Sequence, residues 1–89
     1  MTYTVLATKR VDKKLNRLHR FDQKKVFKIL TLLKTGPFPD GTNIAKMEKS
    51  GKSYRIRTGD IRIIYVYDPQ SKEITVIDVG YRGSVYKGH

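Results

Sequence analysis

The stretch SYRIRTGDIRIIY, residues 53–65, decides the fold because it encodes two short strands and the turn between them. Apolar and polar residues alternate on both sides of Gly59-Asp60, and such a pair commonly closes an antiparallel hairpin. A two-residue turn at this point places Arg57 directly opposite Arg62. The stretch therefore predicts a β-hairpin whose strand register follows from its turn.

Three cations fall on one face of this hairpin, because side chains alternate along a strand. We name Arg55, Arg57 and Arg62 the arginine face. The other face takes the apolar and aromatic residues, which are Tyr54, Ile56, Ile61, Ile63 and Tyr65. A four-residue loop keeps the same residues opposite one another, whereas a three-residue loop with a β-bulge would shift them.

The arginine face should lower the stability of the sheet, and this cost indicates that the cluster has a function. Like charges opposite one another are unfavourable, and only Asp60 at the turn lies close enough in sequence to reach Arg62. The planar guanidinium group suits bidentate contact with phosphate oxygens. We therefore expect a phosphate-binding face; the simpler alternative is three solvated arginines on the outside of a sheet.

Two amphipathic helices are expected before the hairpin. The first begins at Ala7 or Thr8 and ends near His19, with one apolar stripe among cations: Val11, Leu15 and Leu18, surrounded by Lys9, Arg10, Lys13, Lys14, Arg17 and Arg20. In the second, Asp22 is the expected N-cap, Phe21 should pack on Val26, and Gly36-Pro37 ends the helix. Its expected apolar face consists of Val26, Phe27, Ile29, Leu30 and Leu33. Since almost no linker separates the helices, they should form an antiparallel hairpin.

Strands account for most of the remaining chain. Tyr3–Leu6 is a short β-prone run that suits an edge strand, and Gly36–Gly51 reads as a polar loop. Three β-prone segments then follow with short links: Tyr54–Thr58, Ile61–Tyr67 and Ile74–Val79. The sequence therefore predicts a single α+β domain over residues 1–89, in which an N-terminal strand and an antiparallel helical hairpin pack on an antiparallel β-meander sheet.

The net charge points to a polyanionic partner. Nineteen Lys and Arg against eight Asp and Glu give +11 on 89 residues, a balance that favours nucleic acid or a strongly acidic protein. The absence of cysteine excludes a disulfide framework and a thiolate metal site, and no metal or cofactor is expected. No apolar run reaches the ~18 to 20 residues that span a bilayer, so we expect a cytoplasmic protein without a membrane partner.

The end of the chain supplies two more candidate residues. The third strand of the meander continues into Gly80-Tyr81-Arg82, and a tyrosine follows at position 86. This order should bring Arg82 and Tyr86 to the rim of the sheet. A packing role in the core is the alternative for Tyr86. His19 and His89 form no recognisable pair with a carboxylate, and neither they nor Asp78 are assigned to the site.

The segment YRIRTGDIRIIYVYD followed by VIDVGYRGSVYK resembles the RelE toxins of bacterial and archaeal toxin–antitoxin pairs, within the wider RelE/ParE superfamily. The resemblance implies the toxin of a type II pair, a ribosome-dependent endoribonuclease that cuts mRNA in the decoding site and inhibits translation. It also implies an acidic antitoxin protein that binds and neutralises the toxin. The family's site residues match Arg55, Arg57, Arg62, Arg82 and Tyr86 in this sequence.

The roles implied by the resemblance suit metal-independent RNA cleavage. The 2′-hydroxyl attacks the adjacent phosphorus, the arginines bind and stabilise the phosphate, and Tyr86 is the candidate for proton transfer. Well-known family members carry lysine where this chain has Arg55 and Arg57, and an arginine stays protonated. Neither position can therefore serve as the general base.

Two alternative functions fit the same sequence. ParE-like members of the superfamily share the fold and inhibit DNA gyrase without cutting RNA, although they generally lack the full basic set and the terminal tyrosine. A catalytically inactive, basic RNA-binding module would retain salt-dependent affinity but release no product.

Overall fold

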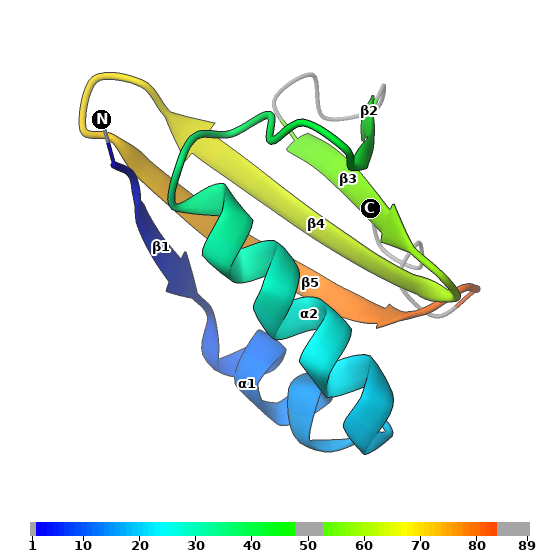
Figure 1. Cartoon of the computed structure of the whole chain (residues 1–89). Coiled ribbons are helices and arrows are strands. Elements are labelled where there is room, and N and C mark those ends of the chain that lie inside the picture. The colour runs from blue at the N-terminus through cyan, green and yellow to red at the C-terminus, as the bar shows by residue number, and fades with distance from the viewer. Residues whose placement is uncertain (1, 48–52, 84–89) are drawn as a thin grey trace.

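The computed structural model describes residues 2–47 and 53–83, which form two helices on a five-stranded mixed sheet (Figure 1). In chain order the elements are β1 (Thr4–Ala7), α1 (Lys9–Asn16), α2 (Arg20–Leu33), β2 (Asn43–Lys46), β3 (Ser53–Thr58), β4 (Ile61–Asp68) and β5 (Glu73–Tyr81). The strand order across the sheet is β1-β5-β4-β3-β2. Neighbouring strands are antiparallel except β1 and β5, which run parallel. The α+β fold and the antiparallel meander of β3, β4 and β5 confirm the sequence prediction.

The β3–β4 hairpin has the predicted two-residue turn and register. Arg57 pairs with Arg62, and Thr58 pairs with Ile61 directly beside the turn. Gly59 has a φ of 59°, in the left-handed region, while Asp60 does not. A turn with glycine first and a positive φ at that position alone is type II′, whose twist matches that of the paired strands. The turn chemistry therefore fixes which residues share a face.

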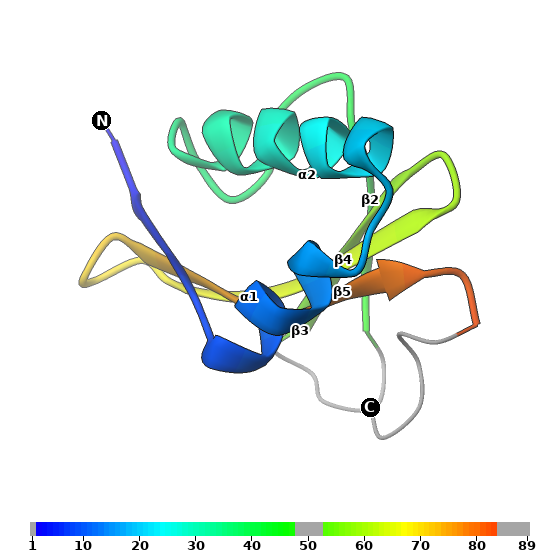
Figure 2. The ribbon, with the colours of Figure 1, turned by 90° about the horizontal axis from the view of Figure 1, so that it is seen from below.

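The two helices occupy different places on the sheet. The Oγ1 atom of Thr8 accepts a hydrogen bond from the Val11 backbone N–H at 3.3 Å and caps the start of α1. From there α1 packs against β5, and α2 runs back across one face of the sheet (Figure 2). The predicted stripe is confirmed, since Val11, Leu15 and Leu18 are all buried. The opposite face of the sheet lies away from α2 (Figure 2).

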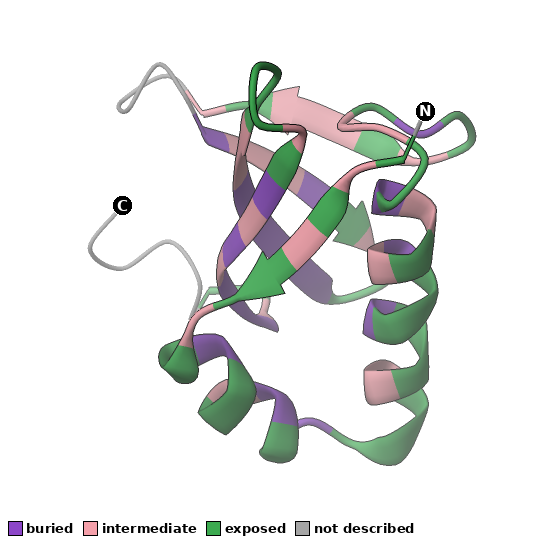
Figure 3. Cartoon of the chain, turned by 90° about the vertical axis from the view of Figure 1, so that its left-hand side faces the viewer, coloured by how far each residue is buried: buried purple, intermediate pink, exposed green. Residues whose placement is uncertain are grey.

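The hydrophobic core lies between α2, α1 and one face of the sheet. Burial alternates over residues 73–77 of β5, residues 61–65 of β4 are all buried, and α2 turns its buried residues toward the sheet (Figure 3). The core residues from the sheet are Ile56, Ile61, Ile63, Tyr65, Ile74, Val76 and Val79, and those from α2 are Val26, Ile29 and Leu33. The core thus covers the face opposite to Arg55, Arg57 and Arg62.

The segment before the hairpin and the start of the second helix differ from the sequence prediction. Residues 43–46, assigned to a polar loop, form β2 and pair with β3 on the side away from β4. This pairing satisfies an edge of β3 that a hairpin alone would leave open, which local sequence cannot reveal. The helix α2 also begins earlier than expected, with His19 as its N-cap and Asp22 in its first turn.

The apolar face of α2 is narrower than the sequence suggested. Phe21 is 80 % exposed, so it does not pack on Val26 as a hydrophobic staple. Phe27 is also exposed, at 54 %. Because α2 begins at Arg20, Phe21 lies inside the helix on its outer side rather than before its cap.

Gly59→Ala should lower the free energy of unfolding by about 1–2 kcal/mol, since a Cβ is unfavourable at a left-handed φ. An added Cβ would also come within 3.0 Å of the Lys25 Nζ atom, which must then move. Urea denaturation measures the change, and Asp60→Ala in the same turn serves as the control with an effect near zero. Equal stabilities for the Gly59→Ala variant and the unaltered protein would contradict the assigned turn.

Candidate nucleic-acid interface

The arginine face lies on two rows of paired residues that cross the sheet. One row runs through Asn43, Arg57, Arg62 and Gly80, one residue from each of β2, β3, β4 and β5. The second row runs through Ala45, Arg55, Ile64 and Asp78 in the same strand order. The two predicted cation positions on β3 and the one on β4 therefore do share the face opposite the core.

A β-bulge in β5 determines which side chains join this face. Ile64 pairs with Asp78 but the next residue of β4, Tyr65, pairs with Val76, so Ile77 is an extra residue. Without the bulge Asp78 and Val76 would point the same way. With it, Val76 enters the core while Asp78 joins the row of Arg55.

Arg62 is far less accessible than the sequence suggested. Its side chain is only 4 % exposed, and Nη1 donates hydrogen bonds to the carbonyl oxygens of Gly59 at 2.8 Å and Ile61 at 3.0 Å. These hydrogen bonds hold the Arg62 guanidinium against the β3–β4 turn. The alternative of three solvated arginines is therefore wrong for Arg62. Arg57, directly opposite, is exposed, and Arg55 is half-buried.

Arg82 reaches the same end of the sheet from β5. Its backbone N–H donates to the carbonyl oxygen of Asp60 at 2.8 Å, which holds the turn after β5 beside the turn after β3. The side chain of Arg82 is exposed. The structure thus brings Arg57, Arg62 and Arg82 to one end of the sheet, as expected; Tyr86 lies outside the described residues.

Asp78 is a buried carboxylate that ties α1 to this face. It is fully buried, and its Oδ1 accepts hydrogen bonds from Lys14 Nζ at 2.6 Å and from the Val79 backbone N–H at 2.9 Å. The Arg10 Nη2 atom lies 3.6 Å from Oδ2. Two cations from α1 thus form ion pairs with this buried carboxylate.

Tyr81 joins β5 to the start of α2 and takes no part in the arginine face. The His19 backbone N–H donates to the Tyr81 hydroxyl oxygen at 3.0 Å, and that hydroxyl donates to Asp22 at 2.7 Å. The first contact lowers the pKa of Tyr81, but burial and the Asp22 carboxylate outweigh it and raise the pKa above its ordinary value. Tyr81 therefore stays protonated and acts as a structural link.

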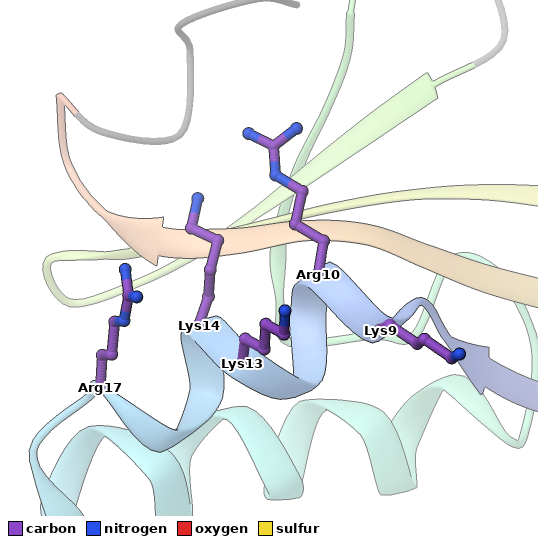
Figure 4. Close-up of a pocket in the computed structure, with 5 residues that line it drawn as sticks. All are labelled: Lys9, Arg10, Lys13, Lys14 and Arg17. Carbon is purple, nitrogen blue, oxygen red and sulfur yellow. The ribbon is translucent and has the colours of Figure 1, made fainter.

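The α1 helix adds cations that were not assigned to the site. Lys9, Arg10, Lys13, Lys14 and Arg17 line one open groove, with the side chains of Arg10, Lys14 and Arg17 extending to the same side of the helix (Figure 4). The sequence showed these cations around the apolar stripe of the first helix. It gave no signal that they lie beside the sheet, because that placement depends on the long-range contact with β5.

The described ranges contain no group of three or more His, Asp or Glu side chains able to hold a metal ion. Neither helix in this part of the chain is long and apolar enough to cross a bilayer.

Solved structures with this arrangement of helices and sheet include toxins in complex with their antitoxins. A RelE–RelB complex from the archaeon Pyrococcus horikoshii matches with a TM-score of 0.81 and 31 % identity, over 96 % of this chain and 100 % of that one. A RelB–RelE complex from Methanococcus jannaschii shares the fold with a TM-score of 0.79 at 23 % identity, over 92 % and 95 % of the two chains. No protein-family profile matches the chain.

Sequence comparison also relates the chain to a RelE toxin. A Methanocaldococcus jannaschii protein that carries the name of a RelE1 toxin is 32 % identical over 88 residues, which cover 98 % of each chain. The chain belongs to the RelE toxin family.

Asp78→Asn should reduce the free energy of unfolding by about 3 kcal/mol, because it leaves the partly buried Lys14 ammonium without its carboxylate. Lys14→Met should also destabilise, since the buried Asp78 carboxylate then loses its shortest ion pair. The double variant should lose at least about 1 kcal/mol less than the sum of the two single losses. Urea denaturation of all four proteins gives this coupling energy, and additive losses would show that the contact contributes nothing.

Proposed function

We propose that this RelE-family protein is the toxin of a type II toxin–antitoxin pair and a ribosome-dependent endoribonuclease. It cleaves mRNA in the decoding site without a metal ion and so inhibits translation in the cytoplasm. The observation that carries the proposal is the meeting of Arg57, Arg62 and Arg82 at one end of the sheet face that lies opposite α2 and the core. Membership of the family and the net charge of +11 support it.

The three arginines have complementary geometries for binding a phosphodiester. Arg57 and Arg82 are exposed and can approach the phosphate oxygens directly. Arg62 is held by two backbone carbonyls, so its charge is fixed in place before substrate binds. Fixed positive charge stabilises negative charge that develops in a transition state without reorganisation at the moment of reaction. Arg55, in the next row, extends the binding face along β3.

The reaction that such a face supports is transesterification within the RNA. The ribose 2′-oxygen forms a bond to the adjacent phosphorus and the bond from phosphorus to the 5′-oxygen breaks, which leaves a 2′,3′-cyclic phosphate and a 5′-hydroxyl. One proton must leave the 2′-hydroxyl and one must reach the departing oxygen. The arginines stay protonated and supply charge alone. Tyr86 is the proposed proton-transfer residue, in agreement with its place in the sequence soon after Arg82.

An acidic antitoxin is the proposed protein partner. RelE proteins of known structure have been solved in complex with RelB antitoxins. A toxin with nineteen basic and eight acidic residues is electrostatically matched to an acidic chain. Such a chain would neutralise the protein by competing with RNA for the same cations.

Primer extension on a defined mRNA in a purified translation system tests the activity directly. The protein is added last, to reactions with and without ribosomes. Cuts within codons that appear only with ribosomes are the expected result. If mRNA stays intact and translation continues, the nuclease proposal is wrong, and inhibition of DNA supercoiling by gyrase becomes the next assay.

Arg57→Ala and Arg82→Ala should each slow ribosome-dependent cleavage by about 10²- to 10³-fold, because each removes one charge from the phosphate site. Both side chains are exposed, so the fold should survive. Arg20→Ala, an exposed arginine at the start of α2, is the matched control and should cleave normally. Unchanged cleavage by both site variants would show that neither Arg57 nor Arg82 takes part in the reaction.

Tyr86→Phe should slow cleavage by about 10²- to 10⁴-fold while ribosome binding stays within twofold, because only the hydroxyl that transfers a proton is lost. Single-turnover cleavage and co-sedimentation with ribosomes measure the two quantities separately. The reverse pattern, with binding lost and the bound protein cleaving normally, would make Tyr86 a binding residue.

A further inference from the structure

The described residues that line the groove along α1 are all basic. The groove has a volume of about 440 Å³ and its lining residues are Lys9, Arg10, Lys13, Lys14 and Arg17 (Figure 4). From Lys9 to Arg17 the helix rises ~12 Å, enough for several positively charged groups to follow an extended polyanion. A solvated helix needs no such concentration, and neighbouring like charges lower helix stability.

The cations of the groove fall into two sets. Lys14 and Arg10 are held by the buried Asp78, which fixes them relative to β5. Among the described residues, Lys9, Lys13 and Arg17 have no ion-pair partner within 4.0 Å. One carboxylate therefore anchors the groove to the sheet while the remaining cations face solvent uncompensated.

The groove lies near the end of β5 that pairs with the arginine face. A second, smaller cavity of about 210 Å³ shares Lys14 and Arg17 with the groove and reaches Gly80 at the end of β5. Gly80 pairs with Arg62, and Arg62 pairs with Arg57. Gly80 therefore lies between the cations at the end of α1 and the paired arginines of β3 and β4.

We propose that the α1 groove is a second phosphodiester-binding site, which holds the single-stranded RNA on one side of the segment bound by the arginine face. This inference rests on the proposed function, since it extends the path of the same RNA strand. Lys9, Lys13 and Arg17 contact successive phosphates, and Asp78 is a positioning residue that keeps Lys14 and Arg10 beside them. The site increases affinity and sets the direction of the strand without joining the chemical step.

Single-stranded RNA fits the groove better than a segment of acidic protein does. A protein helix docks by burying apolar side chains, whereas every described residue that lines the groove is a lysine or an arginine. The large hydrophobic residues that are exposed in the described part of the chain lie elsewhere: Leu6, Phe21, Phe27 and Phe38. A phosphate backbone needs only positive charge and room, and the groove provides both.

The test compares two double variants that remove the same charge. Lys13→Gln with Arg17→Gln neutralises the groove, and Lys24→Gln with Lys28→Gln neutralises two exposed lysines of α2. Fluorescence anisotropy measures the binding of a 12-nucleotide unstructured RNA between 50 and 200 mM salt. The groove variant should bind roughly tenfold more weakly at the lowest salt, and its slope of log K against log salt should shrink by about 1.4. The α2 variant should change affinity less than about threefold.

Three results overturn the proposal. Equal losses in both double variants would mean that net charge alone attracts RNA. Normal RNA binding by the groove variant would exclude the site. The third is the loss of binding to a polyglutamate peptide with RNA binding unchanged, which would assign the groove to an acidic protein. Because the measurement needs no cleavage, failure of the nuclease assay with groove-dependent RNA binding intact would count against the proposed function alone.

Discussion

The pairing of β3 with β4 is the constraint on which the rest of the structure depends. A positive φ at Gly59 allows the two-residue turn, and the turn fixes the register for every pair that follows. The same register that buries Ile56 and Ile63 in the core sets Arg57 against Arg62 on the other face. A slip of one residue would exchange the two faces. Stability and the candidate site therefore have a single geometric origin.

The two faces of the sheet differ in how they are stabilised. The core face gains free energy from apolar burial, whereas the arginine face needs specific polar partners for each charge taken from water. Arg62 finds them in the carbonyls of its own turn, and Asp78 finds them in Lys14 and Arg10 of α1. These contacts cross from one element to another. The polar network thus adds to the hold of the core on α1, whereas α2 is held mainly by the core.

Local pattern was sufficient for the hairpin, the apolar stripe of α1 and the antiparallel meander, because each follows from residues close in sequence. Prediction from local pattern was wrong where pairing with a distant strand determines the local structure. The strand at Asn43–Lys46 forms because β3 offers an open edge, and the bulge at Ile77 turns Asp78 to the arginine face. The burial of Arg62 could not be foreseen either, since an arginine on the outer face of a hairpin is ordinarily solvated. For the candidate site, the sequence placed the three arginines on one face of the sheet but did not indicate that the cations of α1 lie near it.

The parallel pairing of β1 with β5 has a consequence for the order in which the chain can assemble. β1 and α1 come first in the sequence, yet their partners are residues 73–81, near the opposite end. Contacts between such distant segments close large loops and form late in folding. During synthesis α1 and its cations cannot pack against the sheet until β5 has been synthesised. A nascent chain that already has its β3–β4 hairpin therefore still lacks the continuous basic surface, which is completed only when the last strand of the sheet takes its place.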